Sequence, residues 1–151
     1  MSSLIEVVDD RDCKELCLFL AIGLTIKYEK MQSIEDKSVR RLKQRQFTRM
    51  INKRDPYNRQ RRIDTAKELL QKIIDSGIWI DDTLPAYSIQ EHLPLIQKYF
   101  DSLEDPEERC RIVVFGQYGM LKPMFKGSNR AKWNIPIFFH EGHFWGIRNL
   151  K

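Results

Sequence analysis

Cysteine is scarce in this sequence, with three residues among 151, at positions 13, 17 and 110. So small and odd a number argues against a disulfide framework and favours a reducing compartment. The chain also has no run of about 18 or more uncharged apolar residues, which excludes a membrane-spanning helix. Its first residues lack the basic and long apolar regions of a secretory signal. We therefore expect an intracellular protein of the cytoplasm or nucleus, with no membrane partner.

Internal repeats, low-complexity tracts and linkers are also missing from the sequence. A chain of 151 residues, 42% hydrophobic and 31% charged, has the size and composition of one globular domain with a buried core. We expect a single domain over residues 1–151. Because the chain stops just after its last predicted strand, an excised piece of a longer protein remains an alternative.

Acidic residues are almost absent from residues 37–62, which contain eleven Lys and Arg and a single acid, Asp55. This segment carries +10, so the rest of the chain sums to −5. A merely solvated helix face normally interleaves acids with its bases, so the imbalance favours a surface for nucleic acid or an acidic protein partner. Any nucleic-acid contact would be sequence-neutral, with Tyr57 and Phe47 available for stacking. The candidate polyanion-binding residues are Arg40, Arg41, Lys43, Arg45, Arg49, Lys53, Arg54, Arg59, Arg61 and Arg62.

Apolar periodicity predicts helices in the first two thirds of the chain. One covers about residues 13–31, and because its central part carries no charge it should be buried on most sides. A second, amphipathic helix covers 61–74 and ends before Gly77. A third runs from a cap at Ser88 to about Leu103, unless it begins later with Pro94 in its first turn.

Strand patterns and turns occupy the remaining segments. Residues 55–58 read as a turn, and the sequence after 106 changes to short β-type runs. The order of elements predicts an α+β fold, with a buried N-terminal cysteine helix, a helical middle and a mostly antiparallel C-terminal sheet arranged as a meander. The predicted strands are 4–8, 111–115, 120–125, 134–139 and 143–149.

Cys17 and His143 are the candidate reactive residues. Acidic and polar residues precede Cys17, as at a helix N-terminus, where the pKa of a thiol can fall into the nucleophilic range. If the two meet, His143 takes the thiol proton and the thiolate attacks an acyl carbon. The alternative is that Cys17 is a small core residue. Cys13 is the lesser nucleophile candidate, preferable only if the helix starts earlier.

A zinc site is a further arrangement of the same region. Cys13 and Cys17 are four residues apart, and His140 and His143 are three apart. Zinc ligands usually lie on loops or hairpins, whereas Cys17 lies in an apolar run. We expect no metal and no other cofactor.

Two motifs resemble those of the ovarian-tumour (OTU) family of papain-like cysteine proteases. Cys-Leu-Phe-Leu-Ala at residues 17–21 is similar to the Cys-Leu-Phe-Arg-Ala of the family's first motif. The apolar strand 135–139, a short turn and the His143-Phe144 pair resemble its last motif. The chain is also similar to OTU-like domains of Maverick/Polinton-type transposon proteins, which have a basic helical middle segment.

The resemblance implies a papain-like fold and protease or isopeptidase (deubiquitinase-like) activity on ubiquitin-like or polyprotein substrates. It implies Cys17 as nucleophile and His143 as base; Asn149 or an acid among Asp9, Asp10 and Asp12 would orient the imidazole. The chain departs from the family at three positions, and these departures point to the alternative of a catalytically degraded OTU-like module that binds nucleic acid or protein through residues 37–62. The departing residues are Lys14, Leu20 and Trp145.

Overall fold

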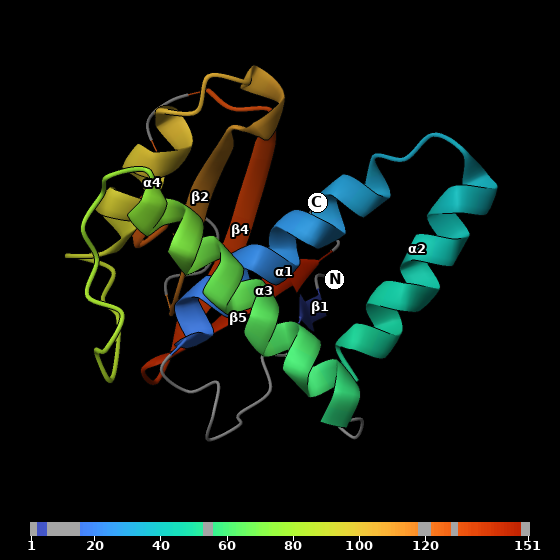
Figure 1. The fold of residues 1–151 in the computed structure, drawn as a ribbon, viewed down its shortest axis with the longest axis horizontal. Helices are drawn as coiled ribbons and strands as arrows, with labels where there is room; N and C mark the ends of the chain where they lie inside the picture. The colour runs from blue at the N-terminus through green and yellow to red at the C-terminus, as the bar shows by residue number, and fades with distance from the viewer. Residues whose placement is uncertain (1–2, 6–15, 53–55, 118–121, 128–129, 149–151) are drawn as a thin grey trace.

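The computed structural model describes residues 3–5, 16–52, 56–117, 122–127 and 130–148. The described part contains four α-helices, one short 3₁₀ helix and five strands, which confirms the α+β class (Figure 1). The helices are α1 (Cys17–Gln32), α2 (Lys37–Met50), α3 (Pro56–Asp75) and α4 (Leu93–Asp101), with the 3₁₀ helix η2 at Pro106–Glu108. The strands are β1 (Ser3–Ile5), β2 (Cys110–Phe115), β3 (Phe125–Lys126), β4 (Trp133–His140) and β5 (His143–Arg148).

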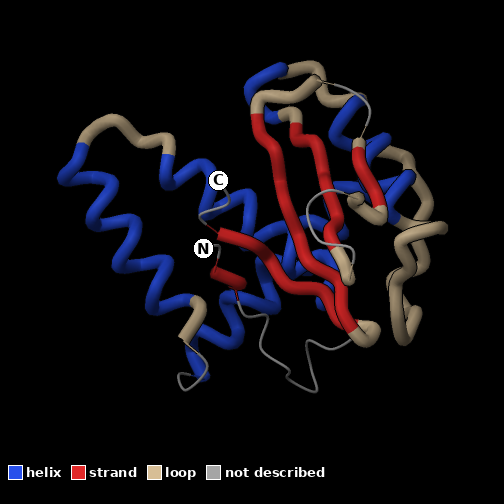
Figure 2. Tube along the Cα trace, turned by 180° about the vertical axis from the view of Figure 1, so that it is seen from behind, coloured by secondary structure: helices blue, strands red, loops and turns tan. Residues whose placement is uncertain are grey.

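The five strands form one mixed sheet in the order β1-β5-β4-β2-β3. Three of its pairings are antiparallel, as predicted for a mostly antiparallel sheet, but β2 and β4 run parallel. The expected meander is therefore wrong at this point. After β2 the chain pairs briefly as β3 on the outer edge, then crosses to the other side of β2 and enters β4 in the same direction as β2. Seen from behind, the strands lie in front of the helices (Figure 2).

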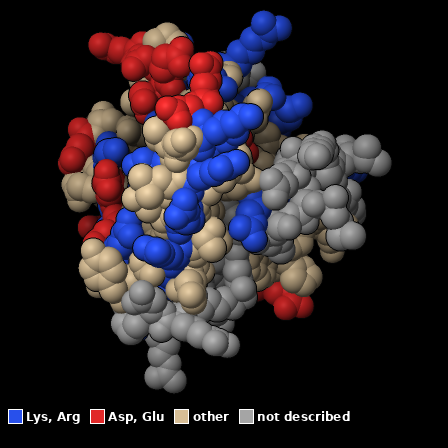
Figure 3. Space-filling view, turned by 90° about the vertical axis from the view of Figure 1, so that its right-hand side faces the viewer, with Lys and Arg blue, Asp and Glu red and all other residues tan. Residues whose placement is uncertain are grey.

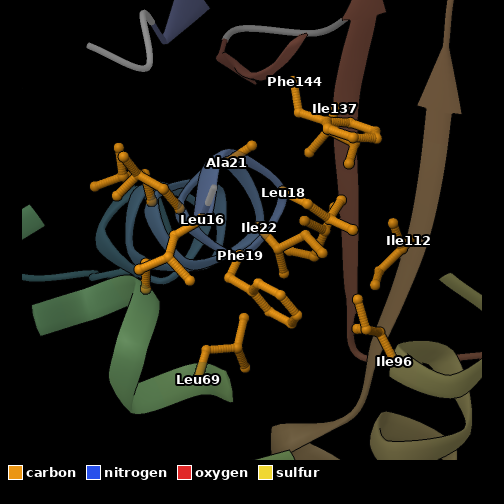
Figure 4. Close-up of a cluster of buried hydrophobic side chains, with 14 of the residues drawn as sticks. Leu16, Leu18, Phe19, Ala21, Ile22, Leu69, Ile96, Ile112, Ile137 and Phe144 are labelled. Carbon is orange, nitrogen blue, oxygen red and sulfur yellow. The ribbon is translucent and has the colours of Figure 1, made fainter. Parts of the chain in front are cut away.

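Helix α1 lies between the sheet and α3, packed against β4 and β5 on one side and α3 on the other. Its residues from Leu18 to Ile22 are at most 1% exposed. Figure 4 looks along this helix and shows Leu18 directed toward Ile137 and Phe144 of the sheet, while Leu69 of α3 lies on another side. The uncharged apolar stretch that forms the first part of α1 suits a position with protein on both sides. The predicted buried helix is confirmed from Cys17 onward; residues 13–15 lie outside the described part.

Helix α3 begins earlier than predicted, whereas α4 begins at one of its two predicted positions. Helix α3 begins at Pro56, so the turn expected at 55–58 is wrong for residues 56–58. Proline suits a first helical position, because an N–H group at that position would have no acceptor within the helix and its absence costs nothing. Helix α4 begins at Leu93 with Pro94 in its first turn, which was one of the two alternatives. The predicted end of α3 is confirmed, since Gly77 follows the helix with φ of +94°.

Helix α2 lies at one side of the molecule, and α2 and α3 diverge at a wide angle from the place where α2 ends and α3 begins (Figure 1). Asp36 caps α2 by accepting hydrogen bonds from the N–H groups of Ser38 and Val39. Phe47 and Met50 are its buried residues, so α2 is attached along a narrow apolar edge. Most of its surface is left to solvent. No helix in the described residues is long and apolar enough to cross a membrane.

Candidate functional site

Cys17 is the first residue of α1 and is buried, with 8% of its surface exposed. The residue before it, Leu16, provides no side-chain cap, and no acidic side chain stands in the first turn. The structure therefore places the predicted nucleophile at a helix N-terminus, inside the hydrophobic core cluster. Cys13, Asn149 and the acidic residues at 9, 10 and 12 lie outside the described residues, so the predicted third catalytic group stays a prediction.

His143 is the first residue of β5 and lies opposite His140 across the hairpin. Side chains alternate between the faces of a strand, and its neighbour Phe144 is directed into the core beside Leu18 (Figure 4). The alternation therefore turns the His143 imidazole away from α1. Its ring lies edge-on to Trp145 with centroids 4.6 Å apart.

The His143 side chain thus belongs to an aromatic group on the outer sheet face. Phe138 and Trp145 are cross-strand partners there with ring centroids 5.9 Å apart, and Phe138 stacks with His140 at 6.0 Å. The Nε2 atom of His143 is buried and has no hydrogen-bond partner among the described residues. Within those residues, no group of three or more His, Cys, Asp or Glu side chains could hold a metal ion.

The basic segment divides into an outer face and an inner face of α2. Lys37, Arg41, Arg45 and Arg49 follow one another every four residues and are all exposed. At 1.5 Å per residue this spacing puts a positive charge about every 6 Å along the helix. We call these four residues the α2 stripe. Figure 3 looks onto the side where α2 lies and shows Lys and Arg side chains in a diagonal band across it.

Among the described residues, no carboxylate forms an ion pair with the α2 stripe. Helix α2 contains six Lys and Arg and no Asp or Glu. The ion pairs found within the described residues lie elsewhere, for example between Lys30 and Glu108 and between Lys132 and Glu107. The stripe is therefore an exposed row of uncompensated positive charge on a capped helix.

Some of the predicted polyanion-binding residues serve the fold instead. Arg62 is 0% exposed, and its Nη1 donates to the carbonyls of Met50 and Asn52, 2.6 and 3.0 Å away. It joins the end of α2 to α3, so its prediction as a surface phosphate contact is wrong. Arg40 is half-buried and donates to the Ile34 carbonyl. Lys53 and Arg54 lie outside the described residues, and Arg59 is half-buried.

The two residues predicted to stack on bases differ in their exposure. Phe47 is buried and packs against Tyr28 with ring centroids 5.7 Å apart, so it is not available for stacking at the surface. Tyr57 is 72% exposed. Phe47 and Met50 are three residues apart, a spacing that places both on one face of the helix, and this spacing was the sequence signal for their burial.

A pocket between α1, α2 and α3 was not foreseen from the sequence. It has a volume of about 480 Å³ and brings Lys27 and Lys30 of α1 near Lys43 of α2 and Arg61 of α3. Lys27 and Lys30 lie ten and seven residues before Lys37, where the basic segment begins, and carried no signal of their own, because only the packing of the three helices unites them with that segment. We call this cavity the three-helix pocket.

Comparison with protein-family models, with curated proteins and with solved structures finds no match to this chain.

Proposed function

We propose that this protein binds nucleic acid, without sequence preference, through the α2 stripe. The observation that carries the proposal is the regularly spaced row formed by Lys37, Arg41, Arg45 and Arg49, in a helix that itself contains no Asp or Glu. Lys and Arg that contact phosphates release condensed counterions, and this release supplies most of the affinity of non-specific binding.

The way in which both ends of α2 are fixed supports such a role. A capped N-terminus at Asp36 and the buried Arg62 at the other end hold the helix in place, so its cations need little further ordering when a polyanion binds. Two further polar side chains, Gln44 and Thr48, lie between the arginines. Two such side chains are too few to recognise a base sequence through the base edges. We therefore expect this face to contact mainly the sugar-phosphate backbone.

Charge reversal of the stripe tests the proposal. We expect Arg41→Glu, Arg45→Glu and Arg49→Glu together to weaken binding of labelled 20-base-pair duplexes of unrelated sequence by about 30-fold or more in fluorescence anisotropy. The matched control reverses Lys67, Lys98 and Lys126, which are exposed cations on other elements, and should stay within about 3-fold of wild type. Equal losses in the two triple variants would show that only net charge matters.

An acidic protein partner is the other outcome of the same assay. Polyglutamate of matched charge serves as competitor for the bound duplex. If polyglutamate binds the stripe as tightly as the duplex does, the partner is an acidic protein surface and the nucleic-acid proposal is overturned.

The cysteine protease or isopeptidase activity implied by the OTU resemblance is a second candidate. Its support is the position of Cys17 at the start of α1 and the packing of α1 against β5, the strand that begins with His143. Against it stands the orientation of His143 on the outer sheet face. Iodoacetamide labelling followed by intact mass tests it: a protease requires one fast thiol that is lost in Cys17→Ala and slowed in His143→Ala. A thiol that reacts at the same rate with and without His143 excludes this pair.

A further inference from the structure

The three-helix pocket combines an apolar interior with a cationic rim. Met31 and Ile34, at the end of α1 and just beyond it, and Phe47 and Met50 of α2 supply the apolar lining. Its volume of about 480 Å³ lies within the range of small-molecule sites. The space is therefore large enough to take one flat ring system with its attached sugar.

Three of its four cations remain available to a ligand. Lys30 is already paired with Glu108, whose carboxylate lies 2.6 Å from Nζ. Lys27, Lys43 and Arg61 are exposed, and among the described residues none of them has an ion pair. They come from three different helices, so three separate elements bring positive charge to the pocket. Among the described residues that line the pocket there is no carboxylate.

We propose that the three-helix pocket receives an unpaired nucleobase of a single-stranded nucleic acid, while Lys27, Lys43 and Arg61 contact the phosphates beside it. The proposal rests on the proposed function and names the form of nucleic acid that the protein prefers. In a duplex each base is paired and stacked, so only a single strand or an unpaired position can place a base in the pocket.

The lining favours an aromatic ring over a fatty acyl chain. The thioethers of Met31 and Met50 and the ring of Phe47 are polarisable groups that contact π-systems favourably. Gln46 adds an amide with both donor and acceptor, which can pair with the edge of a base but has no counterpart on an acyl chain. A fatty acid carries one carboxylate, whereas three separated cations match the repeated phosphates of a strand.

The test compares an octamer of thymidine, dT8, with an eight-residue abasic strand that has the same phosphates and no bases. We expect wild type to bind dT8 about 10-fold more tightly, in line with one stacked base. Gln46→Trp, which fills the pocket from an exposed position, should abolish this preference. Gln71→Trp is the matched control: it adds the same ring at an exposed position of α3 that lines neither the pocket nor the α2 stripe, and it should leave the preference intact.

Failure of this inference is distinct from failure of the proposed function. The stripe variant with Glu at 41, 45 and 49 should weaken both octamers alike and keep their ratio, because it acts only on phosphates. Equal affinity of wild type for dT8 and the abasic strand overturns the pocket proposal while duplex binding stands. Displacement of dT8 by oleate, with no preference for bases, would assign the pocket to fatty acids instead.

Discussion

At the scale of single residues, Arg62 shows how a cation in a basic segment can belong to the core. Its guanidinium donates to two carbonyls at the end of α2, Met50 and Asn52, where helix carbonyls lack partners within the helix. We expect Arg62→Ala to lower the free energy of unfolding by about 2–3 kcal/mol in urea titrations, because buried carbonyls lose their donor and packing is lost. The exposed neighbour Arg61→Ala should change it by less than about 0.5 kcal/mol. Equal effects would mean that Arg62 is not the joint between α2 and α3.

Cys110 provides a second prediction at this scale. Burial raises the pKa of its thiol from 9.0 to about 12, and its Sγ donates to the Glu108 carbonyl at 3.7 Å. The folded protein therefore keeps this proton at pH values where the unfolded chain releases it, so stability falls as pH rises through the window from about 9 to 12. Relative to Cys110→Ala, wild type should lose up to about 1.4 kcal/mol per pH unit in that window, measured by urea unfolding at several pH values. Parallel pH profiles for the two proteins would contradict the assignment.

At the scale of elements, α1 and α3 approach closely at Gly23. A Cβ added there would lie 2.9 Å from Cγ2 of Thr65. We expect Gly23→Ala to destabilise the protein by about 1 kcal/mol, since overpacking outweighs the gain in helix propensity. Adding Thr65→Ser removes that methyl group and keeps the hydroxyl that donates to the Arg61 carbonyl. The double variant should recover about 1 kcal/mol over Gly23→Ala in a double-mutant cycle, and additive effects would show that the helices do not meet at this point.

A side chain of α4 supplies hydrogen bonds to the backbone of β2 outside the two residues that pair with β3. Strand β3 covers only Val113 and Val114, and beside them the Gln97 side chain of α4 donates to the Cys110 carbonyl and accepts from the Ile112 N–H. A side-chain amide thus takes the place of a neighbouring strand, with both bonds 2.9 Å long. We expect Gln97→Leu to cost about 2–3 kcal/mol in thermal or urea unfolding, because two buried backbone groups lose their partners. Gln97→Glu keeps the acceptor but loses the donor, so its stability should lie between that of wild type and that of Gln97→Leu. An unchanged stability in Gln97→Leu would contradict this role.

The elements differ in how far the sequence predicts them. An uncharged apolar run such as that of α1 has only one stable position, so its burial follows from composition. The parallel pairing of β2 with β4 does not follow, because strand direction depends on where the chain crosses between the two strands, and no local sequence pattern indicates that crossing. Gln97 carries no signal either, since a glutamine within an amphipathic helix is ordinarily a solvent-facing residue.

At the scale of the whole molecule, the sequence shows which segment carries the positive charge. It does not show which of the cations in that segment are exposed and which are buried. The excess of Lys and Arg in residues 37–62 is visible from composition alone. Which of these cations face solvent depends on the direction in which α2 packs, and this direction buries Arg62 while it leaves Arg45 exposed. The outward orientation of His143 is likewise fixed by the packing of its neighbour Phe144 on α1. Both outcomes depend on contacts between distant segments, which local patterns do not encode.

The charge arrangement of the whole molecule predicts how binding depends on salt. If the four cations of the α2 stripe each neutralise one phosphate, the logarithm of the duplex affinity should fall with the logarithm of salt concentration with a slope of about −3.6. Arg45→Ala should make this slope shallower by about one unit, because one released counterion is lost. Lys98→Ala removes an exposed cation from α4 and should leave the slope unchanged. Anisotropy titrations between 50 and 200 mM salt, roughly the range over which such contacts lose affinity steeply, measure all three slopes. A wild-type slope flatter than about −1 would mean that the stripe does not contact phosphates, and an equal change in Lys98→Ala would place the contacts elsewhere on the molecule.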